Sequence, residues 1–220
     1  MIPLNTGAIS SVAVIGAHCD DIMIGAGATL LQMAQHNPEL KVHALVLTGA
    51  GTDREIEEKN ALATVFPRSQ VQLTVADLPD GRLPDHWASV KHHIAQFRRR
   101  CQPDLVLGPH RDDYHQDRRL VAELVPTEFR AHLLLWYEIL KWESDLLNPT
   151  LYVDIPTEIA HQKARLIAQC YPSQSHHAWF DDEAFLGLMR VRGVQCRARY
   201  AEAFAGEKAV VSPFGVHSLN

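Results

Sequence analysis

The sequence lacks the features that mark several large classes of protein. It has no Cys-x-x-Cys pair, and its four cysteines lie far apart in 220 residues, so we expect reduced thiols in a cytosolic protein. Basic residues are not in excess, because 21 lysines and arginines face 26 aspartates and glutamates, and we expect no nucleic-acid partner. The N-terminal segment has no basic start and its apolar run ends in two aspartates, which argues against a signal peptide and a membrane span.

What the sequence does contain is the composition of a folded domain and an excess of histidine. Hydrophobic residues make up 46% of the chain and charged residues 21%, which is ordinary for a globular protein. The 13 histidines outnumber the 12 glycines. Histidine is the commonest metal ligand and titrates near neutral pH, so its positions are the first to consider.

Apolar runs typical of buried strands alternate with helical patterns through the first half of the chain. Strands are predicted at 12–17, 42–48, 71–75 and 104–108, and helices at 24–35, 53–66, 84–100 and 116–124. This alternation predicts an α/β protein with a mainly parallel sheet and helices on both faces. Later strands are predicted at 133–139 and 151–155 and helices at 157–170 and 182–191, while 206–220 stays undetermined. No linker divides the chain, so we expect a single domain over 1–220, with the oligomeric state open and a homo-oligomer included.

Polar clusters follow the first and fourth predicted strands, where a parallel sheet presents its ligand sites. The first contains His18, Asp20 and Asp21, and the second spans 109–118. A divalent cation held by His18 and Asp21 would relieve repulsion between the adjacent carboxylates and leave Asp20 free to take a proton from water. The alternative for the first cluster is that an aspartate caps the following helix. The alternative for the second is a solvated polar loop with an N-cap.

Two other motifs have plainer explanations. Gly25-Ala26-Gly27 lacks the third glycine of a dinucleotide fingerprint, and the acidic pair separates it from the strand. We therefore expect these glycines to allow close helix packing. The basic residues 98–100 lie in the last turn of a predicted helix, where cations suit the helix dipole.

Several motifs together resemble the PIG-L/LmbE-like deacetylases. His18-Cys19-Asp20-Asp21 with the glycines that follow is similar to that family's A-H-P-D-D…G-x-G-G-T-L signature, and 115–118 is similar to its H-[PQ]-D-H box. Further similar segments are Asp80-Gly81-Arg82-Leu83, Tyr137-Glu138, Ser173-Gln174 and 200–204, so the resemblance covers nearly the whole chain.

The resemblance implies a Rossmann-like α/β fold and zinc-dependent removal of an N-acetyl group from an amino sugar or sugar conjugate. It implies that His18 and Asp21 bind zinc and that Asp20 is the general base. His115 would stabilise the oxyanion, protonate the leaving amine or serve as a further metal ligand. Zinc would lower the pKa of its water to about 7 and polarise the amide carbonyl, which makes this chemistry coherent.

The chain departs from the family pattern at one position. The last histidine of the H-x-D-H box is replaced by Arg118, whose guanidinium has no lone pair for a metal. A charge of +1 about 5 Å from a divalent ion would repel it by about 7 kcal/mol at an effective dielectric constant near 20. Three outcomes stay open. His115 or His110 becomes the third ligand while Arg118 pairs with Asp112, Asp113 or the substrate; the metal binds weakly through His18 and Asp21; or the metal is lost, Arg118 occupies its place, and the chain binds a sugar or partner without turnover.

Three further groups are candidates for substrate contacts. His110 and Arg118 belong to the second polar cluster, and Arg54 lies just past the second predicted strand, where it can reach a phosphate or hydroxyl group of a substrate. For Arg54 a solvated position in the first turn of a helix is an equal alternative. The segment 173–180, with two histidines, Trp179 and Phe180, is either part of the pocket rim or a surface loop.

Overall fold

One twisted sheet forms the centre of the molecule. The computed structural model describes residues 3–67 and 70–210, and its seven-stranded sheet has the order β3-β2-β1-β4-β5-β7-β6. The strands are β1 (Ser11–Gly16), β2 (Lys41–Thr48), β3 (Gln70–Leu78), β4 (Leu105–Pro109), β5 (Leu133–Tyr137), β6 (Leu151–Ile155) and β7 (Tyr200–Gly206). Strands β1 to β5 pair in parallel, and β7 runs antiparallel to both of its neighbours. The predicted mainly parallel sheet is therefore confirmed.

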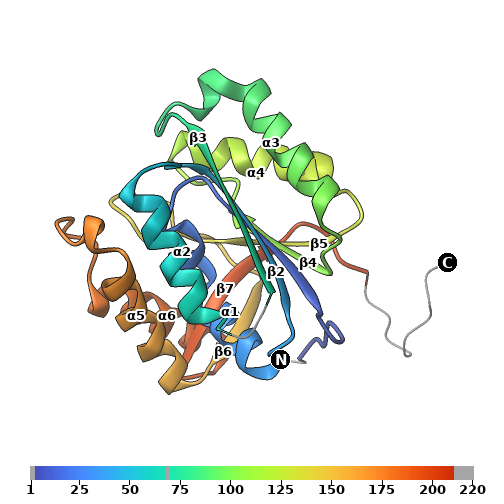
Figure 1. Ribbon diagram of the computed structural model, residues 1–220. Coiled ribbons are helices and arrows are strands. Elements are labelled where there is room, and N and C mark those ends of the chain that lie inside the picture. The colour runs from blue at the N-terminus through green and yellow to red at the C-terminus, as the bar shows by residue number, and fades with distance from the viewer. Residues whose placement is uncertain (1–2, 68–69, 211–220) are drawn as a thin grey trace.

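Helices cover both faces of this sheet (Figure 1). They are α1 (Asp21–His36), α2 (Asp53–Val65), α3 (Trp87–Arg100), α4 (Gln116–Glu128), α5 (Thr157–Cys170) and α6 (Asp182–Cys196), with the 3-10 turns η1 (Leu83–His86) and η2 (Pro172–Gln174). Helices α3 and α4 lie on one face, and α1, α2, α5 and α6 lie on the other. This is the predicted arrangement. None of the helices within 3–67 and 70–210 is long and apolar enough to cross a membrane.

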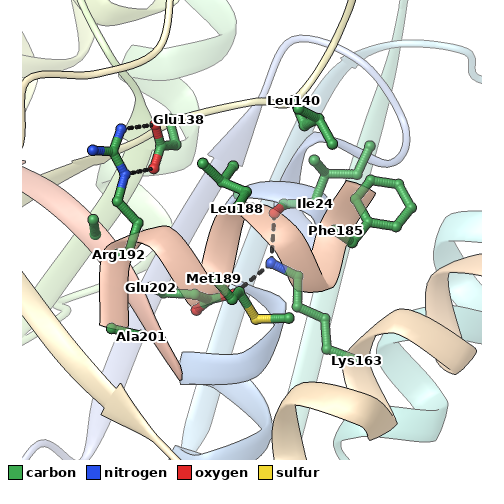
Figure 2. A pocket seen from close by; sticks show the side chains of 12 residues that line it. Ile24, Glu138, Leu140, Lys163, Phe185, Leu188, Met189, Arg192, Ala201 and Glu202 are labelled. Atoms are coloured by element: carbon green, nitrogen blue, oxygen red, sulfur yellow. Dashed lines mark hydrogen bonds and ion pairs between the residues drawn. The ribbon is translucent and has the colours of Figure 1, made fainter. Parts of the chain in front are cut away.

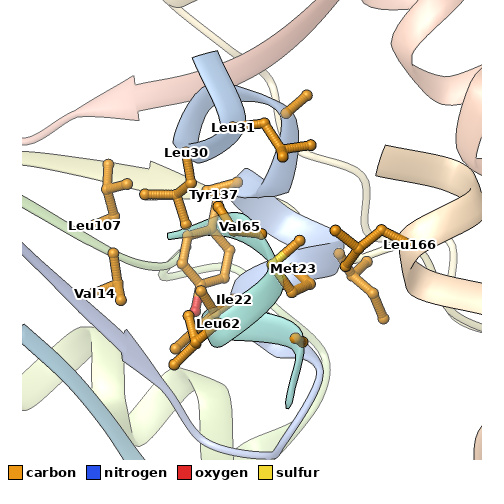
Figure 3. Packing of buried hydrophobic residues seen from close by; sticks show 14 of the residues in the cluster. Val14, Ile22, Met23, Leu30, Leu31, Leu62, Val65, Leu107, Tyr137 and Leu166 are labelled. Atoms are coloured by element: carbon orange, nitrogen blue, oxygen red, sulfur yellow. The ribbon is translucent and has the colours of Figure 1, made fainter. Parts of the chain in front are cut away.

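Each layer of helices buries its own apolar core against the sheet. On the α1 face, Ile22 and Met23 pack with Leu62, Leu107 and Tyr137 (Figure 3). On the opposite face, a second cluster lies between the sheet and the α3–α4 pair. All six residues of β1 are buried, as expected for a strand covered on both sides, which explains its unbroken apolar sequence.

The boundaries differ from the predictions at a few elements. Helix α1 begins at Asp21 rather than at 24, so both carboxylates of the first cluster lie at its start. Strand β7 is absent from the predictions, although it lies between β5 and β6 and completes the sheet. Of the undetermined segment 206–220, residues 211–220 lie outside the described part of the chain.

The topology fixes the place of the site. Strands β1 and β4 are neighbours, and they lead into α1 on one face and α4 on the other. A crevice opens where the chain leaves adjacent parallel strands toward opposite faces, and ligands of such sheets bind there. Both polar clusters follow these two strands.

Candidate active site between β1 and β4

The turn between β1 and α1 holds Asp20 in an unusual backbone conformation. Asp20 has φ 105°, in the left-handed region that non-glycine residues seldom adopt. Its N–H donates to Glu58 Oε2 at 3.0 Å, and the Tyr171 hydroxyl donates to the same oxygen at 2.7 Å. The Asp20 side chain makes no capping hydrogen bond to α1, so the helix-cap interpretation is wrong for this residue. Strain of this kind persists where surrounding contacts enforce it, and it is common at functional sites.

The Asp20 carboxyl is buried and its pKa is raised. Burial raises the pKa of its carboxyl to about 6, and the nearby Arg54 guanidinium opposes this rise. Arg54 Nη2 lies 2.9 Å from Asp20 Oδ2 and also donates to the Cys19 carbonyl. A carboxyl with this pKa is largely ionised at neutral pH and can still take up a proton during a reaction. Arg54 thus contacts Asp20 itself, a contact that the sequence did not predict.

Asp21, the residue after Asp20, is paired with Arg118. Asp21 Oδ1 accepts from Arg118 Nε at 3.0 Å and from Nη2 at 2.7 Å. Its other oxygen accepts the backbone N–H groups of Ala17 and His18 at 2.9 and 3.1 Å. Asp21 is fully buried and Arg118 nearly so. The Arg118 charge, with hydrogen bonds from His18 and Arg118, holds the pKa of Asp21 far below its usual range against the opposing effect of burial.

A group of possible metal ligands surrounds Nε2 of the His18 ring. His18 Nε2 lies 3.0 Å from Asp80 Oδ1 and 3.1 Å from Asp117 Oδ2. The ring of His115 meets the ring of His18 edge to face at a centroid distance of 4.6 Å. One donor atom from each of these four residues lies within 4.8 Å of the others. Burial disfavours a charged His18, but hydrogen bonds to carboxylates prevail and raise its pKa well above the usual value.

His115 is oriented by the helix that it begins. It is the N-cap residue of α4, and its Nδ1 accepts the Asp117 backbone N–H at 3.3 Å. Burial, with the neighbouring charges of His18 and Arg118, lowers the pKa of His115, so its ring is neutral near pH 7. A neutral ring that accepts at Nδ1 carries its proton on Nε2. His115 can therefore donate a hydrogen bond at Nε2.

The buried ion pair between Lys163 and Glu202 holds the first turns of α1 in place (Figure 2). Lys163 Nζ donates to the Ile24 carbonyl at 2.7 Å and lies 2.6 Å from Glu202 Oε1. The Glu202 carboxylate accepts the backbone N–H groups of Ala28 and Thr29 at 2.9 and 2.7 Å. These contacts from α5 and β7 tie the helix that presents Asp20 and Asp21 to the far half of the chain.

His110 belongs to a separate group. It is 2% exposed, and its Nε2 lies 3.9 Å from Asp113 Oδ2. Lys141 Nζ lies between Asp113 Oδ1 and Asp145 Oδ2, at 3.2 and 2.5 Å. Burial lowers the pKa of His110. The structure thus places His110 against buried side chains under the β4–α4 loop.

The donor chemistry distinguishes two metal-binding arrangements. In the arrangement that the sequence resemblance implies, Asp21 is a ligand, but each of its oxygens already accepts two N–H groups and Arg118 lies against Oδ1. That arrangement does not fit a cation. The imidazole and carboxylate donors around His18 are ligands that zinc accepts.

Asp80 was absent from the predicted site, although its place in an Asp-Gly turn after β3, at the same edge of the sheet, was a usable signal.

Comparison with solved structures gives matches over almost the whole chain. An N,N'-diacetylchitobiose deacetylase from Pyrococcus horikoshii has 18% identity and a TM-score of 0.68, covering 94% of this chain and 88% of that one. The 4-carboxy-2-hydroxymuconate hydratase GalB from Pseudomonas putida KT2440 has 20% identity and a TM-score of 0.71, covering 94% and 100%. The A40926 pseudoaglycone deacetylase Dbv21 has 16% identity and a TM-score of 0.68, covering 92% and 99%. At these identities the likeness establishes a shared fold.

The family assignment comes from the sequence itself. The family model PIG-L, described as GlcNAc-PI de-N-acetylase, matches residues 13–128, which is more than half of the chain. The matched segment begins in β1 and ends with α4, so it contains both polar clusters. The chain therefore belongs to the PIG-L family.

Proposed function

We propose that this protein is a hydrolase that removes the N-acetyl group from an amino sugar or an amino-sugar conjugate. The observation that carries the proposal is that Asp20 and His115 follow the neighbouring strands β1 and β4 and offer a proton acceptor and a hydrogen-bond donor. Asp20 is a buried carboxyl with a pKa of about 6, and His115 is a neutral imidazole with a proton on Nε2. One can accept a proton from water while the other stabilises developing negative charge.

The two side chains account for the proton transfers of amide hydrolysis. Asp20 removes a proton from water as the water oxygen bonds to the carbonyl carbon. His115 donates its Nε2 hydrogen bond to the carbonyl oxygen, which becomes negatively charged in the tetrahedral intermediate. Protonated Asp20 then returns the proton to the nitrogen as the carbon–nitrogen bond breaks. The products are acetate and a free amine.

A divalent cation bound near His18 would polarise the carbonyl and lower the pKa of the attacking water. We propose zinc, because the surrounding donors are imidazole and carboxylate groups. Arg54 holds Asp20 through the contact to Oδ2, and Oδ1 is the oxygen that would accept a proton from water. Arg54 would therefore act on orientation and on the pKa of the base.

The substrate class is inferred from the family and from two structural neighbours. The family description names a GlcNAc-PI de-N-acetylase, and two of the neighbours are deacetylases. The aromatic segment near the site, in which His177 stacks on Trp179 at 5.6 Å, offers a surface for a sugar ring. All four cysteines are free thiols, which supports a reducing cytoplasmic location.

The test is direct product detection. The purified protein, supplied with zinc, is incubated with N-acetylglucosamine, N,N'-diacetylchitobiose and UDP-N-acetylglucosamine, and released acetate and free amine are quantified. Equal amounts of acetate and amine from at least one substrate support the proposal. Absence of both products from this panel and from N-acetylglucosaminyl lipids would contradict it.

A second candidate function is binding of an acetylated sugar without turnover. The Arg118–Asp21 pair favours it, because this pair occupies a carboxylate that the resemblance assigns to the metal. Isothermal titration with the same sugars separates the two functions. Binding with no acetate released supports the second candidate, and acetate release supports the first.

A further inference from the structure

We infer that this chain binds a divalent cation through His18, Asp80 and Asp117, and that Asp21 is not a ligand. The inference rests on the proposed function only for the choice of zinc as the cation. In this arrangement Asp21, which pairs with Arg118, is replaced as a ligand by Asp80 and Asp117, whose carboxylates lie at Nε2 of His18. A ring nitrogen of His115 belongs to the same group of possible ligand atoms.

Two carboxylate oxygens lie within hydrogen-bond distance of the same nitrogen of His18, and a single N–H cannot make a good hydrogen bond to both. His18 Nε2 carries at most one hydrogen, yet Asp80 Oδ1 and Asp117 Oδ2 lie 3.0 and 3.1 Å from it. Ligand atoms around a tetrahedral zinc ion are roughly 3.3 Å apart, given zinc–nitrogen and zinc–oxygen bonds of about 2.0–2.2 Å. A small outward movement of the two carboxylates therefore makes room for the ion.

The charges of this cluster match a divalent cation. The carboxylates of Asp80 and Asp117 both face His18 Nε2, and a bound cation would take the place of the proton that these carboxylates favour on the ring. On the other side of His18, Asp21 is already balanced by Arg118, with Nη2 at 2.7 Å from Oδ1. Among the ion pairs of the described residues, Asp80 and Asp117 pair only with His18, whereas Asp21 also pairs with an arginine, which a cation could not displace as it displaces a proton.

The loop that carries Asp80 is tied to the first turn of α4. Asp117 accepts the Gly81 N–H at Oδ2 (2.7 Å) and the Leu83 N–H at Oδ1 (3.0 Å), and Gln116 Nε2 donates to the Gly81 carbonyl at 2.9 Å. Gly81 has φ +75°, which lets the loop turn back at this point. The two carboxylates are thus held together before any ion binds.

The two carboxylates differ in their access to solvent. The Asp117 side chain is fully buried, whereas that of Asp80 is 74% exposed. Catalytic zinc sites combine three protein ligands with one open position for water or substrate. Three ligands with one of them at the surface meet that requirement, and His115 Nε2–H can then donate to the molecule in the open position.

The experiment is a cobalt(II) titration of the full-length chain after treatment with a chelator. Bound cobalt is followed by its visible absorption, zinc affinity is measured by competition, and circular dichroism verifies folding. Asp80→Asn is the principal variant, because an exposed side chain can be changed without disturbing the core. Asp85→Asn is the matched control, since Asp85 is an exposed carboxylate on neighbouring η1.

The inference predicts one cobalt ion per chain and an affinity that falls about 100-fold or more in Asp80→Asn but not in Asp85→Asn. It also predicts that the double variant Asp21→Asn/Arg118→Met keeps the wild-type affinity within about threefold, since it leaves all three ligands in place. Unchanged affinity in Asp80→Asn would overturn the inference. So would no binding by the wild type, or loss of binding in a folded double variant.

These outcomes are separable from those of the proposed function, because binding is measured without substrate. Cobalt binding that depends on Asp80, in a protein that releases no acetate, would uphold the site and contradict the hydrolase. Acetate release that persists in Asp80→Asn with unchanged metal affinity would do the reverse.

Discussion

Replacing Arg118 by methionine tests whether this guanidinium compensates a buried carboxylate. Asp21 is fully buried, and two of the four N–H groups that it accepts come from Arg118. Removal of one partner of a buried ion pair typically costs about 3–5 kcal/mol, because the remaining charge stays buried without its counter-charge. For a chain of this length that cost lowers the melting temperature by roughly 6–20 °C. Urea unfolding at pH 7.5 measures the free energy directly.

A second variant separates this cause from general damage. In Asp21→Asn/Arg118→Met the side-chain oxygen can still accept the Ala17 and His18 N–H groups without a net charge. We expect it to recover more than half of the stability lost in the single variant. Arg165→Met, on the exposed side of α5, is the control and should change the free energy of unfolding by less than about 0.5 kcal/mol. A single variant that costs under about 1 kcal/mol, or a double variant no more stable than the single, would refute the reasoning.

Three further predictions concern the supports of the site. Burial raises the pKa of Glu58 to about 7 from 4.5, so its contribution to stability is complete below pH 4.5 and is lost as the pH rises through about 7. Relative to Glu58→Gln, the wild type should lose about 3 kcal/mol across that interval in urea titrations, and parallel pH profiles would contradict this. Gly25→Ala places a methyl group inside the Tyr137 ring and should cost about 1–3 kcal/mol in thermal unfolding, whereas an unchanged melting temperature would mean that the two are not in contact. Lys163→Met leaves Glu202 buried without a counter-charge and should destabilise the protein by about 3 kcal/mol or more in urea, with Glu202→Gln added to it restoring part of the loss; no restoration would contradict the pairing.

The regular part of the fold could be predicted because local signals and tertiary structure agree there. The apolar run of β1 is buried in the sheet, and the helices that follow it pack their apolar faces against that sheet, so the local pattern already indicates the final burial. Strand β7 escaped prediction because its sequence, Tyr200–Gly206, is rich in alanine and contains Glu202. That carboxylate is buried for a tertiary reason, its bonds to α1 and Lys163, which no local pattern contains.

The candidate site was predictable to the extent that strand ends reveal it. His18, Asp20 and His115 stand where two adjacent strands end, and the sequence indicates this directly. Arg118 pairs with Asp21, 97 residues away, and not with Asp112 or Asp113, the nearby partners that the sequence suggested, so this pairing is visible only in the folded chain. Asp80 comes from a third strand, and its approach to His18 depends on the turn at Gly81.

The central claim is that Asp20 performs the proton transfers of N-acetyl hydrolysis. The decisive measurement is the rate of acetate release from N,N'-diacetylchitobiose, in the presence of zinc, by the wild type, Asp20→Asn and Asp112→Asn. Asp112 is an exposed carboxylate on the β4–α4 loop and serves as the matched control. We predict measurable release by the wild type and by Asp112→Asn, and a rate lower by about 100-fold or more in Asp20→Asn. Equal rates in the wild type and Asp20→Asn would contradict the claim, as would a wild type that releases no acetate.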